Sequence, residues 1–302
     1  MKLIRSEEGG SVIITALLMV VMLGMAGLAI DMGLMYKTKS SLSKTANTAV
    51  LSGAQELVNS EESVRRVVDK ILLAEGEEES LREINIDTEG TYRLNVILER
   101  EEPMYFLKLF NLKSMKISSS ATAELAAISR AHGAVPLGID ESIPLEYMKE
   151  YSLKVDSGYS EYGNFGILAL SGPGARLYEQ DLRNGYQNEI KVGDIINTET
   201  GNIAGKTRDG VNYRINSCPY PEGDITSRDN PRIMLVLVYE PYEVDSNQMK
   251  KVKVTGFAYF YLKSPMGHND SSIKGYFIKR VGNGIGDGDL KSNGAYAIRL
   301  VE

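Results

Sequence analysis

Several short motifs carry residue types that could do chemistry, and phosphate binding is the first to consider. Residues 171–175 read Ser-Gly-Pro-Gly-Ala, and a glycine-rich loop before a helix can bind phosphate through its backbone N–H groups. This loop lacks a Lys-Ser or Lys-Thr pair and does not complete the Gly-x-x-x-x-Gly-Lys spacing of a nucleotide-binding loop. We therefore predict a loop that leads into a helix, and no nucleotide cofactor.

Two groups of oxygen ligands could hold a divalent cation. Asp140-Glu141-Ser142 begins like the Asp-x-Ser-x-Ser metal motif of adhesive domains, but Pro144 stands at the second serine position. Asp287 and Asp289 could bring two carboxylates to calcium, yet an EF-hand loop would need an oxygen ligand where Lys291 stands. We predict no metal site and a turn between two strands at residues 284–289, with calcium at Asp287 and Asp289 as the alternative.

Nucleophilic catalysis has little support in the sequence. The chain has two histidines, His132 and His268, and no Gly-x-Ser-x-Gly motif. Cys218 is the single cysteine, so it cannot form an internal disulfide, and a lone cysteine is more often buried and inert than reactive. We predict a non-enzymatic protein without catalytic or cofactor-binding residues.

Composition and charge narrow the class further. Hydrophobic residues make up 43% and charged residues 25% of the 302 residues, which is typical of globular protein and excludes a disordered or fibrous chain. The net charge is -6, and no basic cluster is dense enough to follow a phosphate backbone, so nucleic acid is not an expected partner. Because 29 glycines and 17 tyrosines favour turns and strands, part of the chain is expected to be β-sheet.

One segment differs from the rest of the chain in its content of charged residues. Residues 9–30 carry no charge, and as an α-helix they would extend about 33 Å, enough to cross a bilayer. A cleaved signal peptide and a buried core helix are the competing interpretations; the run is longer than a signal peptide needs and apolar on every face. We predict a membrane anchor. Positive charges lie on both sides of the run, with Lys2 and Arg5 before it and lysines after it. Their numbers are too similar to decide the orientation of the helix in the membrane.

The helix is expected to continue beyond the membrane as a stem. No proline occurs between residues 31 and 57, and apolar or small residues recur at helical spacing in this stretch. They are Met35, Leu42, Ala46, Ala49, Val50, Gly53 and Leu57. The small residues among them would let another backbone come close, which is the geometry of a pilin-like stem.

The remaining sequence predicts a small α+β unit and then a mainly β domain. Residues 60–76 indicate a helix with Ser60 as its N-cap or, as the alternative, Ser63. Residues 84–98 indicate a hairpin, residues 103–110 a short helix with an apolar side, and residues 114–126 a strand with one buried face. After Arg130 the chain is rich in glycine and tyrosine. Strands are expected at 233–239, 251–262, 274–281 and 295–301, and a helix that starts at Thr200-Gly201-Asn202 and runs to Tyr213.

The N-terminal residues resemble a known family. The pattern is a polar tail that ends in Gly9-Gly10, an apolar run, an Asp-x-Gly-x-x-Tyr motif and an alanine-rich helix, and it is similar to the N-terminal region of TadG-like Flp pilus-assembly proteins of the tight-adherence (Tad) system. Asn47 stands where the family usually has an acidic residue. The residues that carry the resemblance, and that we expect to mediate interactions of the stem, are Asp31, Gly33, Tyr36, Leu42, Ala46, Ala49 and Gly53. Two parts of the β domain, residues 157–166 and 194–216, also resemble a domain seen in such proteins.

The resemblance implies an organisation that the charges left open. It implies a cytoplasmic tail (1–10), a membrane helix and stem (11–58), a membrane-proximal α+β unit (59–130) and an extracytoplasmic, mainly β domain (131–302). The expected function is an accessory or assembly role in a Flp/Tad pilus or secretion system, including cell adhesion. The expected partners are the lipid bilayer, other pilus-assembly subunits and a second stem through self-association.

Two alternatives stay open. A processed minor pseudopilin would be cut after Gly10, but Thr15 stands where such a subunit carries Glu. A membrane-anchored hydrolase or wall-carbohydrate-binding module would use exposed tyrosines such as Tyr259, Tyr261 and Tyr276 as a binding platform.

Overall fold

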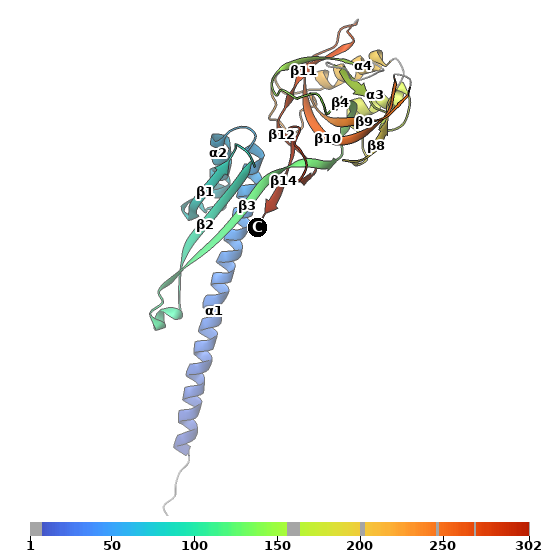
Figure 1. The fold of residues 1–302 in the computed structure, drawn as a ribbon. Coiled ribbons are helices and arrows are strands. Elements are labelled where there is room, and N and C mark those ends of the chain that lie inside the picture. The colour runs from blue at the N-terminus through green and yellow to red at the C-terminus, as the bar shows by residue number, and fades with distance from the viewer. Residues whose placement is uncertain (1–7, 156–163, 200–202, 246–247, 269, 302) are drawn as a thin grey trace, which may run out of the picture. The chain divides into compact units, whose positions relative to one another are not determined.

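A single long helix, α1 (Glu8–Gly53), carries both the uncharged run and the stem (Figure 1). The computed structural model describes residues 8–155, 164–199, 203–245, 248–268 and 270–301. The large apolar side chains between Val12 and Met25 are all exposed, whereas buried positions recur on one face from Asp31 onward. The helix is therefore apolar on all sides at its start and amphipathic in its second half.

Helix α2 (Glu61–Glu75) follows a short 3₁₀ helix, η1 (Ala54–Glu56), and has the ends that the sequence predicts. The Ser60 hydroxyl accepts a hydrogen bond from the backbone N–H of Ser63 at 3.2 Å, which caps the first turn. Gly76 ends the helix in the left-handed conformation with a φ of 68°. Val64, Val68 and Leu72 form its buried face.

The α+β unit is completed by three strands. β1 (Leu81–Asp87) follows a 3₁₀ turn, η2 (Glu78–Ser80), and pairs antiparallel with β2 (Arg93–Pro103), which confirms the predicted hairpin. β3 (Ser114–Ala131) is the next strand of this sheet. β2 and β3 extend past β1 along α1, with a 3₁₀ helix η3 (Leu107–Phe110) at their tip (Figure 1).

The segment at the tip differs from the sequence prediction. The sequence predicts a short helix with an apolar side over residues 103–110. The structure instead has a single 3₁₀ turn that ends at Asn111 in the left-handed conformation (φ 65°). Leu109 and Phe110 are 78% and 75% exposed, so the apolar residues face outward.

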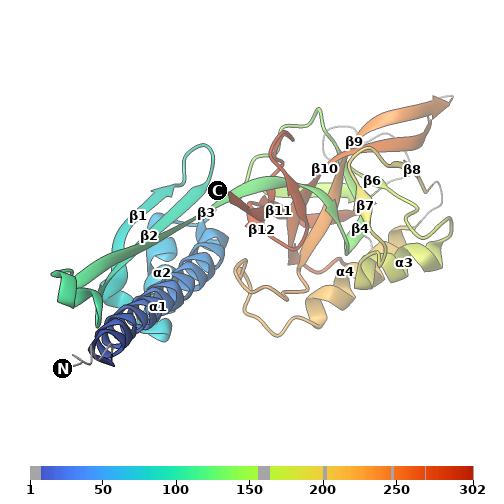
Figure 2. The ribbon, with the colours of Figure 1, turned by 90° about the horizontal axis from the view of Figure 1, so that it is seen from below.

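The chain forms two compact units, and the boundary between them, at Ala123 and Glu124, falls within β3. The second unit, Glu124–Arg299, is mainly β with two helices, α3 (Ala175–Asn184) and α4 (Ala204–Asn216). The two helices lie next to each other (Figure 2). Together with the first unit this confirms the predicted α+β class. The helix predicted up to Tyr213 continues to Asn216, while residues 200–202, where it was expected to start, lie outside the described residues.

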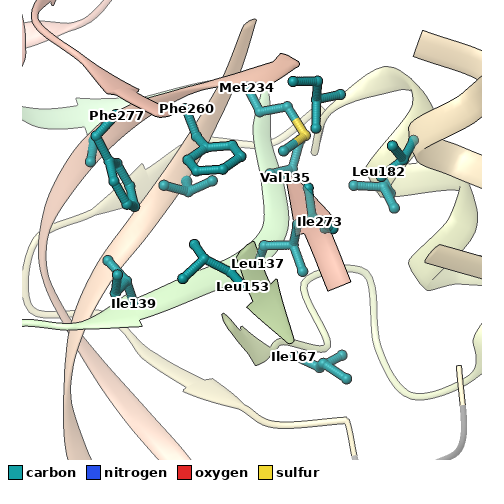
Figure 3. Close-up of a cluster of buried hydrophobic side chains, with 14 of the residues drawn as sticks. Val135, Leu137, Ile139, Leu153, Ile167, Leu182, Met234, Phe260, Ile273 and Phe277 are labelled. Carbon is teal, nitrogen blue, oxygen red and sulfur yellow. The ribbon is translucent and has the colours of Figure 1, made fainter. Parts of the chain in front are cut away.

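The main sheet of the second unit closes on itself. Its strands run in the order β11 (Ser272–Ile278), β5 (Glu150–Val155), β6 (Asn164–Ile167), β4 (Ala134–Asp140), β9 (Ile233–Asp245), β10 (Gln248–Ser264) and β8 (Ile195–Asn197). An additional pairing joins β11 to β10 and makes a barrel. Figure 3 shows side chains such as Leu137, Met234 and Phe260 turned toward one another in its interior, with Leu182 added from α3.

The short strands of this unit lie elsewhere. β7 (Ile190–Lys191) and β13 (Ile285–Asp287) both pair with β3, and β12 (Arg280–Val281) pairs with β14 (Ala295–Val301). The residues from Ile285 to Asp287, which the sequence predicts as part of a turn, are therefore a strand.

The long strands pack on both faces, as the apolar run at residues 233–239 predicted. Met234, Val236 and Val238 belong to the barrel interior, while Leu235, Leu237 and Tyr239 belong to a second core outside it. In β10 the side chains do not keep one alternation between the two faces, because a bulge between Val254 and Gly256 shifts the register. As a result Val252 and Val254 share the second core with Phe257, Tyr259 and Tyr261.

Candidate functional site

The inner face of the stem is packed against its own unit. Leu42, Ala46 and Ala49 are fully buried, and α1 contacts both α2 and β2. A Cβ atom added at Gly53 would lie 2.7 Å from Leu94 Cδ2 and 2.9 Å from Val68 Cγ2, closer than real Cβ contacts. This face therefore accepts only small residues at its closest point, and its occupant is the α+β unit.

We expect Ala49→Leu to overpack this contact and to lower the free energy of unfolding of the first unit by about 1 to 3 kcal/mol. Pulse proteolysis of the detergent-solubilised protein in urea measures this change. The matched control is Lys44→Ala on the exposed face of the same helix, which should stay within about 0.5 kcal/mol. If Lys44→Ala destabilises the unit and Ala49→Leu does not, the two faces of the stem are assigned backwards.

The outer face of the stem contains two of the candidate residues. Tyr36 is 77% exposed, and a Cβ atom at Gly33 would meet no other atom within 4 Å. Neither residue packs within the unit, in contrast to Leu42, Ala46, Ala49 and Gly53. The seven candidates thus separate into a buried inner face, an exposed outer face and Asp31.

Asp31 binds the tip of the β2–β3 hairpin. Its Oδ1 accepts the backbone N–H of Tyr105 at 3.0 Å, and its Oδ2 accepts those of Phe106 at 2.9 Å and Leu107 at 2.7 Å. The Asp31 side chain is buried beneath these residues. One carboxylate therefore pairs three consecutive backbone donors, and hydrogen bonds to a charged acceptor are stronger than those between neutral groups.

A close packing contact lies one turn below Asp31. A Cβ atom at Gly27 would come within 2.8 Å of Phe106 Cβ and would also clash with the ring. Glycine at position 27 therefore lets Phe106 lie directly on the backbone of α1. The hairpin tip is held to the helix at two points, Gly27 and Asp31.

A third contact joins the stem to β2 and to the turn between α2 and η2 through charged groups. The Arg100 guanidinium contacts Glu77 Oε1 at 2.8 Å and Glu102 Oε1 at 2.9 Å, and it donates to Thr38 Oγ1 at 3.1 Å. Thr38 in turn donates to Glu102 Oε1 at 2.9 Å. The Glu77 side chain is only 5% exposed, so its charge depends on Arg100 for compensation. Sequence reasoning missed this cluster, because its members are far apart in the chain.

The chemical motifs of the second unit have structural partners. The Ser171 hydroxyl donates to Asp181 Oδ1 at 2.8 Å, and the Gly174 N–H at the start of α3 donates to Glu199 Oε2 at 2.7 Å. A carboxylate of the protein itself thus occupies the place that a phosphate would take, and the loop leads into a helix as predicted. Asp140 Oδ1 accepts both the N–H and the hydroxyl of Ser142 in a local turn.

The candidate metal ligand Asp287 and the Cys218 thiol also have hydrogen-bond partners within the protein. Asp287 Oδ1 accepts the N–H of Asp289, and the half-buried Cys218 thiol donates to Asn230 Oδ1 at 3.2 Å. Within the part of the chain that the structure describes, no group of three His, Cys, Asp or Glu side chains is placed to hold a metal ion.

The tyrosines proposed as a carbohydrate platform are not exposed. Tyr261 is fully buried and Tyr259 is 9% exposed, because both lie in the second core, which covers the outer face of β10. Tyr276 stacks on Tyr261 with ring centroids 4.9 Å apart. The prediction of an exposed aromatic platform at these three residues is therefore wrong.

Asp224 organises a loop of the second unit. Its Oδ2 accepts the Ser227 hydroxyl at 2.5 Å, and its Oδ1 accepts the backbone N–H groups of Thr226 at 2.8 Å and Ser227 at 3.1 Å. The Ser227 hydroxyl and these further bonds lower the pKa of Asp224 to about 2, against the opposing effect of partial burial.

A pH dependence follows from this carboxylate. Because its pKa in the folded protein lies below the value of about 3.9 in an unfolded chain, its contribution to stability is present above about pH 4 and is lost as the pH falls toward 2. We expect the difference in thermal midpoint between the wild-type protein and Asp224→Asn to shrink over this range. A difference that stays constant between pH 4 and pH 2 would contradict the assignment.

With this geometry established, comparison with known proteins identifies the helix and stem. Residues 10–56 match the Tad family model, described as putative Flp pilus-assembly TadE/G-like. The match confirms the resemblance drawn from the sequence. No curated protein and no solved structure matches the chain.

The Tad match covers α1 up to its end and the turn that follows it. Asp31, Gly33, Tyr36 and the inner face from Leu42 to Gly53 all fall inside it, whereas the hairpin tip and Arg100 lie outside. The matched segment is thus the element onto which the rest of the first unit packs. This segment relates the chain to Flp pilus-assembly proteins. The match does not cover the barrel of the second unit.

Proposed function

We propose that this protein is a single-pass, membrane-anchored accessory component of a Flp/Tad-type pilus, with its N-terminus in the cytoplasm and its bulk outside the membrane. It acts by protein–protein interaction and not by catalysis. The observation that carries the proposal is that the Tad match coincides with a helix long and apolar enough to cross a membrane.

The exposure of α1 supports the anchor. Between Val12 and Met25 every large apolar side chain is at least 49% exposed. Only 6% of the most apolar 18-residue stretch of α1 is buried within the protein. A core helix of a soluble protein would bury one face of such a segment, so this exposure favours lipid as its surroundings.

The outer face of the stem is the proposed contact with pilus subunits. The inner face is filled by the protein's own unit, so self-association or partner binding along the stem would use Gly33 and Tyr36. A photo-cross-linking amino acid in place of Tyr36 should form an adduct with another pilus subunit in cells that assemble pili. The matched control is Tyr242, which is 57% exposed on β9. Adducts of equal yield at both positions, or none at Tyr36, would contradict this assignment.

Topology gives a separate prediction. Protease added to protoplasts should digest the chain after Asp31 and leave a short membrane-protected fragment that contains the apolar part of α1. An N-terminal epitope tag should remain on that fragment. Full protection of the chain would overturn the proposed orientation.

The pseudopilin alternative makes a different prediction about the N-terminus. Thr15 donates its hydroxyl to the Ser11 carbonyl within the helix and offers no carboxylate for assembly. We therefore propose an anchor that is not cut after Gly10. N-terminal sequencing that begins at Ser11 would favour the pseudopilin instead.

A further inference from the structure

The tip of the β2–β3 hairpin, residues 104–113, is an apolar element beside the membrane helix. We propose that this tip inserts into the lipid leaflet that surrounds the C-terminal end of the span, as a second membrane contact. The inference rests on the proposed function in one respect, that residues 11–30 of α1 lie in a bilayer.

The position of the tip follows from its contact with Gly27. Gly27 lies inside the uncharged run and precedes Asp31 by four residues, which corresponds to about 6 Å along the helix axis. Because Phe106 lies directly on Gly27, it must sit at the depth of the last turn of the span. Elements at a membrane interface bury their apolar side chains by about 5–10 Å, so this depth fits an inserted loop.

The side chains of the tip have the composition of an interfacial element. Leu109 and Phe110 are its most exposed apolar residues, and Tyr105 and Leu112 are 54% and 50% exposed. In water this would be an unusual cluster of large apolar groups on a short turn. Tyrosine favours the membrane interface, where its ring is apolar and its hydroxyl stays wet.

Two lysines frame these apolar residues. Lys108 and Lys113 are both exposed, and lysine can extend its ammonium group to anionic headgroups while its alkyl stem stays in the apolar layer. The apolar side chains of the tip could therefore enter the lipid layer while the two lysines contact anionic headgroups.

The backbone of the tip is also prepared for an environment without water. Unpaired N–H groups are costly in lipid, and here Asp31 accepts those of Tyr105, Phe106 and Leu107. The N–H groups of Met104, Leu109, Asn111 and Leu112 donate to carbonyl groups within the hairpin. The Asp31 carboxylate thus removes three N–H groups that would be costly to leave unpaired in lipid.

Intrinsic fluorescence tests this proposal, because the chain has no tryptophan. Three full-length variants with one tryptophan each are reconstituted in bilayers of phosphatidylethanolamine and phosphatidylglycerol, with or without brominated acyl chains. Phe110→Trp probes the tip, Leu23→Trp the span and Leu51→Trp the exposed stem about 36 Å beyond Gly27. We expect the brominated lipid to quench Phe110→Trp and Leu23→Trp strongly and Leu51→Trp hardly at all.

The outcomes separate the tip from the anchor. Quenching of Leu23→Trp without quenching of Phe110→Trp would overturn the insertion of the tip and leave the anchor standing, and Leu109→Trp repeats the test at the neighbouring position. Protection of Phe110→Trp from aqueous acrylamide without quenching by lipid would mean that protein covers the tip, which also overturns the proposal. Absence of quenching at Leu23→Trp would overturn the anchor itself.

Discussion

Replacement of Asp31 by alanine is expected to release the β2–β3 tip from α1. The substitution leaves the N–H groups of Tyr105, Phe106 and Leu107 without their acceptor, so their hydrogen exchange should accelerate by about tenfold or more. Residue-resolved hydrogen–deuterium exchange of the full-length protein in detergent measures the three amides directly.

Asp31→Asn provides a graded comparison. An asparagine can keep one carbonyl oxygen at the position of Oδ2, where it still accepts from Phe106 and Leu107, while the N–H of Tyr105 loses its acceptor. We expect faster exchange mainly at Tyr105. Asp69→Ala, at an exposed acidic residue of α2, is the control and should leave all three amides unchanged. Wild-type exchange in Asp31→Ala would contradict the role assigned to the carboxylate.

Replacement of Arg100 by methionine is the second substitution with a large expected effect. Methionine keeps much of the apolar volume but leaves Glu77 buried without a cation, while Thr38 and Glu102 lose their shared donor. Removing one partner of a buried ion pair typically lowers the free energy of unfolding by about 3 to 5 kcal/mol. Because the Arg100 side chain is itself 37% exposed, we expect about 3 kcal/mol, at the low end of this range. Pulse proteolysis in urea reports the change in the free energy of unfolding.

A double-mutant cycle shows whether the buried charge is the cause. Adding Glu77→Gln to Arg100→Met removes the unpaired carboxylate, so part of the lost stability should return. Arg65→Met is the matched control, because Arg65 and Glu61 form an exposed pair on α2 that contributes about 0.5 kcal/mol or less. Equal effects of Arg65→Met and Arg100→Met would argue against a special role for the cluster.

Local signals in the sequence were sufficient for α2 and for the buried face of β2 in the first unit. Ser60 and Gly76 define the ends of α2 because a hydroxyl cap and a left-handed glycine act within one turn of the helix. Strict alternation in β2 places Leu94, Val96 and Leu98 inside for the same local reason. These features need no information from distant parts of the chain.

The interactions of the candidate site could not be predicted in the same way. Asp31 lies 74 residues before Tyr105. No residue near Pro103 indicates that a distant carboxylate accepts the N–H groups of the residues that follow it. Gly27 could have been a signal, since a glycine in an apolar helix permits close approach, but its partner Phe106 is equally remote. The motif Asp-x-Gly-x-x-Tyr was recognised by resemblance, and only the structure separates its buried Asp31 from its exposed Tyr36.

The barrel shows a second kind of limit. Apolar and polar or aromatic residues alternate in the sequence of residues 251–262, but register shifts in β10, among them the bulge between Val254 and Gly256, break this alternation in the structure. Tyr259 and Tyr261 are buried because a second core covers the outer face of β10, and this burial removes the carbohydrate platform. The pairing of β11 with β10, which closes the barrel, depends on contacts between strands and leaves no mark in either strand alone.

Counting surface pili tests the central claim most directly. In a strain that lacks this protein, electron microscopy should show pili lost or strongly reduced, with restoration by the wild-type chain and not by a chain whose span is interrupted, for example Leu18→Arg with Met22→Arg. Comparison is made at equal abundance of the complementing proteins. Unchanged pilus number in the deletion strain, or full restoration by the interrupted span, would contradict a membrane-anchored role in pilus assembly.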